Sequence, residues 1–288
     1  MITIDLTPAE AMVLLDPQAK QGREAFKVSL MWLLAQHHLK ATEIPARWFK
    51  RRTTQLRRGP QAGAALPPDL KSVMMTVQAS GTGFMDDIVK EAHKRFGDKL
   101  LGYQNDCIYP SLLGRGLLRR TETTHFMLFT RQTYDHTSEG RELCRRIEAM
   151  FQDARRIPAF LDHSPAQAAA LALSLGGLIL LMPELRPHLE EIASVVRRSA
   201  TTDSSSGGSS GGESLSSDTS VSDRKGKSAD EQTSAERDEF HFDFANLDFG
   251  DIDNLDSSLS ALDASFDSSA DSGSGGDGGG DGGGGGGD

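Results

Sequence analysis

Residues 105–151 (NDCIYPSLLGRGLLRRTETTHFMLFTRQTYDHTSEGRELCRRIEAMF) constrain the fold more than any other part of the chain. An apolar helical segment ends at Gly114-x-Gly116, where glycine adopts a positive φ at little cost. Residues 117–121 and 126–134 have the composition of strands, and the polar TETTH sequence is typical of the turn between them. Thr137 then begins a helix whose apolar side chains recur at helical spacing. The pattern predicts helix, turn, hairpin and helix, in that order.

A helix, a β-hairpin and a closing helix are the parts of a winged helix. Residues 33–42 (LLAQHHLKAT) align without gaps on residues 112–121 (LLGRGLLRRT), 79 positions later, and in both a Leu-Leu helix end leads into a strand. The unit is therefore expected twice, with chance similarity as the alternative. We predict a mainly α fold with small β-hairpins, in which tandem winged-helix-like units are followed by closing helices and a disordered acidic C-terminal tail.

Charge and composition separate the chain into two parts. Residues 201–288 contain 20 acidic and 4 basic side chains, a net charge of −16, whereas residues 1–200 contain 27 basic and 21 acidic ones, a net charge of +6. The second part is dominated by Ser, Gly and Asp, which bury too little apolar surface to offset the entropy of ordering. The predicted units are a helical, winged-helix-like unit (1–44), a basic turn-rich connector (45–80), a second winged-helix-like unit with closing helices (81–198) and the disordered tail (199–288).

Basic side chains gather in two places and predict an anion-binding or DNA-binding surface. In the connector, arginine and lysine suit phosphate while an aromatic ring supplies a stacking or insertion surface; the alternative is a solvated loop. The second group lies around the predicted hairpin of the central stretch. The candidate residues are Arg47, Trp48, Lys50, Arg51, Arg52, Arg115, Arg119, Arg120 and Arg131.

The tail contains one segment that alternates acidic with apolar residues (EFHFDFANLDFGDIDNLDSSLSALDASF, residues 239–266). Such segments bind a partner protein through their apolar anchors, although an acidic tail that only keeps the protein soluble has the same composition. The opposite charges of tail and body also allow contact between them within one chain. The candidate anchors are Phe240, Phe242, Phe244, Leu247 and Phe249.

The sequence contains no recognisable catalytic or metal-binding motif. Asp135 and His136 are adjacent, but no Ser or Cys stands in a nucleophile context, and the cysteines Cys107 and Cys144 lack metal-ligand spacing. We therefore expect neither enzymatic activity nor a cofactor. The first ten residues do not resemble a secretory signal, so a cytoplasmic location is expected, with peripheral attachment to a membrane as the alternative. The apolar run 166–182 predicts a buried closing helix or, alternatively, a segment in contact with lipid.

Three stretches resemble the Golgi phosphoprotein 3 family: LTPAEAMVLL, GTGFMDDIVKEAHKRF and LLGRGLLRRTETTHFMLF. The resemblance covers residues 5–180 and implies a mainly helical fold that binds phosphatidylinositol 4-phosphate on a basic surface. The chain also resembles bacterial proteins of unknown role that combine winged-helix-like units with a Gly-rich C-terminus. Residues 126–145 are similar to the end of the wing in transcription regulators of the MarR and PadR type, which implies DNA binding through Arg115, Arg119, Arg120 and Arg131.

These observations favour a non-enzymatic intracellular binding or adaptor protein. Its basic helical body is expected to dock on an anionic surface, such as a phosphoinositide membrane, or on a protein. The alternative is a winged-helix DNA-binding transcription regulator. One observation disfavours it: the helical segment before the hairpin is poor in the side chains that contact base edges.

Overall fold

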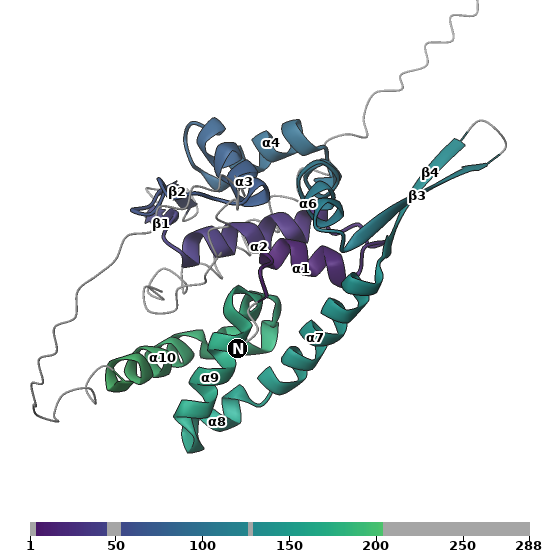
Figure 1. The fold of residues 1–288 in the computed structure, drawn as a ribbon. Helices are drawn as coiled ribbons and strands as arrows, with labels where there is room; N and C mark the ends of the chain where they lie inside the picture. Colours follow the sequence, from purple (N-terminus) through teal and green to yellow (C-terminus); the bar gives the residue numbers. More distant parts are fainter. Residues whose placement is uncertain (1–3, 45–52, 126–128, 204–288) are drawn as a thin grey trace, which may run out of the picture.

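The computed structural model describes residues 4–44, 53–125 and 129–203, and within these ranges the protein is mainly helical with two antiparallel strand pairs (Figure 1). This confirms the predicted fold class at that level. The elements in order are α1 (Pro8–Leu15), α2 (Gly22–Ala35), β1 (Leu39–Ile44), β2 (Thr53–Arg58), α3 (Pro68–Ala79), α4 (Met85–Phe96), α5 (Leu101–Tyr103), the π-helical turn η1 (Gln104–Ile108), α6 (Tyr109–Gly114), β3 (Leu118–His125), β4 (Phe129–His136), α7 (Ser138–Ala154), α8 (Ile157–His163), α9 (Pro165–Leu175), the 3-10 helices η2 (Gly176–Leu181) and η3 (Pro183–His188), and α10 (Leu189–Asp203).

Helix α2 lies at the centre of the core. All of its side chains from Val28 to Ala35 are buried, as expected for a helix that other elements cover on every side. The rings of Phe26 and Tyr103 form a T-shaped pair with centroids 5.6 Å apart, and those of Tyr103 and Phe96 form another with centroids 5.5 Å apart. Burying one such aromatic side chain contributes about 2–3 kcal/mol. Figure 1 shows α3 and α4 on one side of α1 and α2, and α8, α9 and α10 on the other.

Local signals in the sequence correctly predicted several helix boundaries. Thr7 and Glu10 form a capping box: the Glu10 N–H donates to Thr7 Oγ1 at 3.2 Å, and the Thr7 N–H donates to Glu10 Oε2 at 2.9 Å. Thr137 caps α7 by accepting from the Gly140 N–H at 3.0 Å. Helix α4 ends before Gly97, whose φ is +80°.

The predicted internal repeat has a counterpart in the backbone. Helix α2 ends at Ala35 and β1 begins at Leu39, while α6 ends at Gly114 and β3 begins at Leu118, in both cases 79 positions later. Between helix and strand lies a residue with positive φ, His37 (56°) in the first copy and Gly116 (69°) in the second. The same helix end, left-handed turn and strand start therefore occur twice.

Three expectations from the sequence need correction. The connector 45–80 contains β2 and α3, so it is not simply turn-rich. The TETTH sequence lies at the end of β3 and is not the hairpin turn, because its residues pair with β4. The apolar run 166–182 is not one helix: α9 ends at Leu175, and Gly176, with φ of 55°, starts a 3-10 segment. No helix in the described ranges combines the length and apolar character needed to cross a bilayer.

The start of α7 packs closely on the start of β3, which yields a stability prediction. A Cβ at Gly140 would lie 2.0 Å from the Leu117 carbonyl oxygen, whereas one at Gly114 would have no atom within 4 Å. We expect Gly140→Ala to lower the free energy of unfolding by about 1–3 kcal/mol through overpacking, and Gly114→Ala to raise it by about 0.5–1 kcal/mol. Urea denaturation of the two variants tests this, and equal effects would contradict the close approach.

Candidate functional site

The hairpin β3–β4 projects from the helical body (Figure 1). Its strands pair antiparallel from Leu118↔His136 to His125↔Phe129. Side chains alternate between the two faces of such a ribbon, so directly paired residues share a face. Arg119, Thr121, Thr133 and Asp135 therefore occupy one face, and the backbone position of Arg131, paired with Thr123, falls on the same face.

The two adjacent arginines of β3 differ in their surroundings. Arg120 is on the opposite face and donates to the carboxylate of Glu122, with Nε at 3.0 Å from Glu122 Oε1, so an exposed ion pair partly offsets its charge. Arg119 is exposed and makes no hydrogen bond or ion pair with any residue in the described part of the chain. Arg119 is thus the better placed of the two to bind an external anion.

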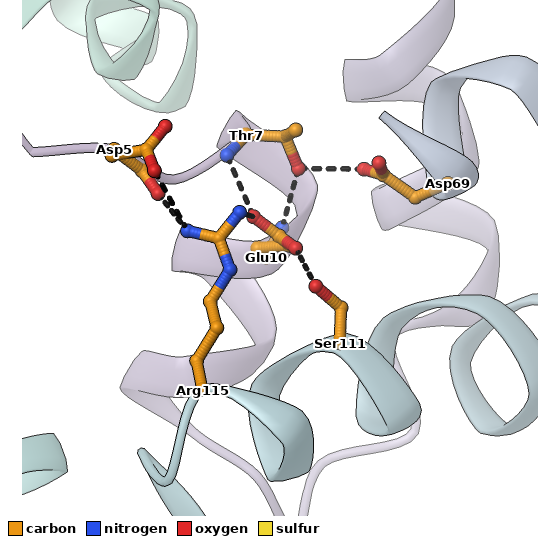
Figure 2. Close-up of polar contacts among 6 residues, drawn as sticks. All are labelled: Asp5, Thr7, Glu10, Asp69, Ser111 and Arg115. Atoms are coloured by element: carbon orange, nitrogen blue, oxygen red, sulfur yellow. Dashed lines mark hydrogen bonds and ion pairs between the residues drawn. The ribbon is translucent and has the colours of Figure 1, made fainter. Parts of the chain in front are cut away.

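Arg115, another predicted anion contact, is partly exposed but already pairs with acidic residues of the same chain. Its guanidinium lies between the carboxylates of Asp5 and Glu10, with nitrogen–oxygen distances of 3.5 Å and 3.7 Å, and it also donates to the Asp5 carbonyl oxygen (Figure 2). Arg115 follows α6 and precedes β3, so these contacts attach the base of the hairpin to α1. We infer that Arg115 orients the hairpin.

Further contacts fix the base of the hairpin on the body. The Tyr134 ring stacks on the Tyr109 ring with centroids 3.7 Å apart, and Gln18 Nε2 donates to the Tyr134 carbonyl oxygen at 2.5 Å. The Tyr109 hydroxyl donates to the Pro17 carbonyl oxygen at 2.7 Å, and burial raises the pKa of this hydroxyl to about 12. The phenol therefore stays protonated at neutral pH and keeps its role as donor. These contacts limit rotation of the hairpin relative to α1.

The first hairpin, β1–β2, carries the other basic group. Lys40 and Arg57 are opposite each other and exposed, while Ala41 and Leu56 form the pair that packs into the core. Sequence reasoning missed Lys40, and only the pairing with Arg57 reveals it. Five predicted residues, Arg47, Trp48, Lys50, Arg51 and Arg52, fall in the connection between these strands and lie outside the described residues.

The structure does not bring the two basic groups together. In Figure 1 the hairpins β1–β2 and β3–β4 are at opposite ends of the body. Among the described residues, Lys40 and Arg57 of the first hairpin are therefore far from Arg119 and Arg120 of the second, and β3–β4 is the hairpin that projects. The candidate tail anchors Phe240, Phe242, Phe244, Leu247 and Phe249 also lie outside the described residues.

Two buried carboxyl groups belong to the same set of contacts as Arg115 (Figure 2). Glu10 of α1 is fully buried and accepts from the Thr7 N–H and from the Ser111 hydroxyl. Asp69 of α3, 1% exposed, accepts from the Thr7 hydroxyl at 2.6 Å (Figure 2). Burial, and then the nearby Glu10, raise the pKa of Asp69 to about 7, and these effects outweigh the hydrogen bond from Thr7 that favours its charged form.

The carboxyl pair connects three parts of the chain that are distant in sequence. Thr7 bonds both acids, Ser111 brings in α6, and Arg115 balances the charge of Glu10. None of these groups has the arrangement of a nucleophile activated by a base. They form a polar contact that connects α1, α3 and the base of the hairpin. Within it, the Asp69 carboxyl takes up a proton near neutral pH.

Comparison of the chain with protein-family models, with curated proteins and with solved structures finds no match.

Proposed function

We propose that the protein is a non-enzymatic adaptor that docks on an anionic, phosphoinositide-bearing membrane surface through the Arg119 face of hairpin β3–β4. The observation that carries this proposal is the exposed Arg119, without a partner among the described residues, on a hairpin that projects from the body. A basic group held away from the body reaches a flat surface before the body does. The resemblance of residues 5–180 to the Golgi phosphoprotein 3 family favours the same class of ligand.

The hairpin is suited to docking because its base is anchored. Ordering a long charged side chain or a loop on binding costs free energy, and a support that is already rigid reduces this cost. Arg115, Tyr109 and Tyr134 provide that support in the free protein. We further propose that the two helix–hairpin units are tandem winged-helix-like modules, of which the second carries the docking surface.

Charge reversal distinguishes the two faces of the hairpin. One basic side chain near an anionic membrane contributes about 1 kcal/mol, so we expect Arg119→Glu to cost about 2 kcal/mol, a loss of roughly thirtyfold in vesicle affinity. Arg120→Glu should cost less, because Glu122 already compensates Arg120. The matched control is Arg145→Glu on α7, an exposed arginine paired with Glu142 at 3.0 Å. Vesicle co-sedimentation of the full chain measures all three, and equal affinities would reject the hairpin face.

DNA binding is the rival explanation for a basic hairpin, and the structure offers it less support. In a winged helix the helix before the wing enters the major groove. Here that helix is α6, six residues long, and it buries Tyr109 and Leu112 in the core. Binding of duplex DNA that competes with vesicles and depends on Arg119 would favour the regulator instead.

A further inference from the structure

A pocket of about 200 Å³ opens between α1, α2, η2 and η3. Its floor is apolar, with Val28, Met31 and Leu180 buried and Met12 at its edge. Three charged side chains from α2 and η3, none of them buried, also line it: Lys27 and Arg186 are basic, and Glu24 is acidic. The pocket therefore combines an apolar interior with a rim of net positive charge.

Arg186, one of the charged residues that line the pocket, has an unsatisfied hydrogen-bond donor. The side chain is half-buried, and its Nε is buried without a hydrogen-bond acceptor anywhere in the described ranges. The guanidinium also forms no ion pair with a residue in the described ranges, and a carboxylate is the anion that a guanidinium binds best. The occupant expected here has an apolar group for the floor and a carboxylate for Arg186.

The size of the pocket favours a peptide side chain over a free small molecule. Pockets for free ligands are usually about 300–1,000 Å³. A volume near 200 Å³ suits one or two aromatic or aliphatic anchors of a segment that lies across the opening.

We propose that the pocket binds the chain's own acidic-aromatic segment, residues 239–256, with Phe242 or Phe244 as the anchor. This segment contains six acidic residues and neither lysine nor arginine, so its charge complements the rim. The flanking acids Glu239 and Asp243 supply carboxylates for Arg186.

The connection along the chain is long enough for this contact. Helix α10 follows η3 directly, so the chain leaves the body from an element adjacent to one wall of the pocket. Helix α10 has 15 residues, about 22 Å at 1.5 Å per residue. The 36 residues from 204 to 239 span up to about 120 Å when extended, several times the distance back along the helix.

Methionine methyl resonances of the full chain test the contact, because Met12 and Met31 line the pocket whereas Met74 and Met85 do not. The double variant Phe242→Ala, Phe244→Ala removes the proposed anchors. We expect the variant to change the chemical shifts of the Met12 and Met31 methyl groups, because it removes the phenyl ring that lies beside them in the proposed contact. The chemical shifts of Met74 and Met85 should not change. The matched control is Leu259→Ala, Leu262→Ala in the neighbouring part of the tail, which should shift none of them.

A second readout observes the tail itself. Arg186→Gln should shift the backbone amide signals of residues 240–249, and Arg145→Gln on the exposed face of α7 should not. Unchanged Met12 and Met31 signals in the anchor variant would overturn the proposal, as would shifts that grow with protein concentration, which indicate a second copy as the occupant.

Discussion

Replacing Glu10 by alanine is expected to lower the free energy of unfolding by about 2–4 kcal/mol, because it removes a buried carboxylate and leaves its hydrogen-bond donors without an acceptor. Glu10 is fully buried, accepts from the Thr7 N–H and from the Ser111 hydroxyl, and forms an ion pair with the Arg115 guanidinium at 3.7 Å. Without it, the buried Thr7 N–H and the half-buried Ser111 hydroxyl lose their acceptor, and Arg115 keeps only the exposed Asp5. Chemical denaturation of the full chain measures the loss.

A matched control separates this effect from the loss of a negative charge. Glu148 on α7 is exposed, and Glu148→Ala should change the free energy of unfolding by less than about 0.5 kcal/mol. If Glu10→Ala were as mild as Glu148→Ala, the network of Figure 2 would not hold the base of the hairpin.

Stability is expected to fall as pH rises from about 4 to about 7, because the folded protein keeps a proton on Asp69 that the unfolded chain releases near its ordinary pKa of 3.8. Burial and Glu10 raise the pKa of this carboxyl to about 7, so its contribution is favourable at acidic pH and is fully lost above neutrality. A difference of about three pKa units corresponds to a free-energy change on the order of 4 kcal/mol.

Asp69→Asn tests this directly. The amide resembles the protonated carboxyl and still accepts from the Thr7 hydroxyl, but it does not titrate. We expect the variant to match the wild type at acidic pH, to be the more stable of the two at pH 8, and to lack the decline between. Denaturation midpoints across the pH range provide the measurement, and parallel profiles for the two proteins would exclude Asp69 as the titrating group.

The parts of the fold that were predictable depend on neighbours in sequence. The Thr7–Glu10 capping box, the Thr137 cap and the Gly97 end of α4 need only residues within one helical turn. Helix α3 carried a readable signal, since Leu70, Val73, Met74 and Val77 recur at helical spacing, but the basic and Pro-rich context concealed it. Strand β2 had no such signal: Leu56 is its only apolar residue, and pairing with β1 determines its conformation.

The site was less predictable than the fold because its contacts join distant positions. The arginines in and around the hairpin were visible in the sequence. The sequence did not show which of them form ion pairs with acidic residues of the same chain. Arg115 is compensated by Asp5 and Glu10 across 110 and 105 positions of chain, and Asp69 reaches Thr7 across 62. Capping chemistry explains Glu10 as the partner of Thr7. The hydrogen bonds from Ser111 of α6 to Glu10 and from Thr7 to Asp69 of α3 become visible only in the folded structure.

Co-sedimentation of the full chain with vesicles tests the central claim most directly. Neutral vesicles are compared with vesicles of the same lipid that also contain phosphatidylinositol 4-phosphate, at low and at high salt. We predict binding that requires the phosphoinositide and weakens as salt screens the charges. Equal binding to neutral vesicles, or none to either kind, would contradict docking of the Arg119 face on an anionic membrane.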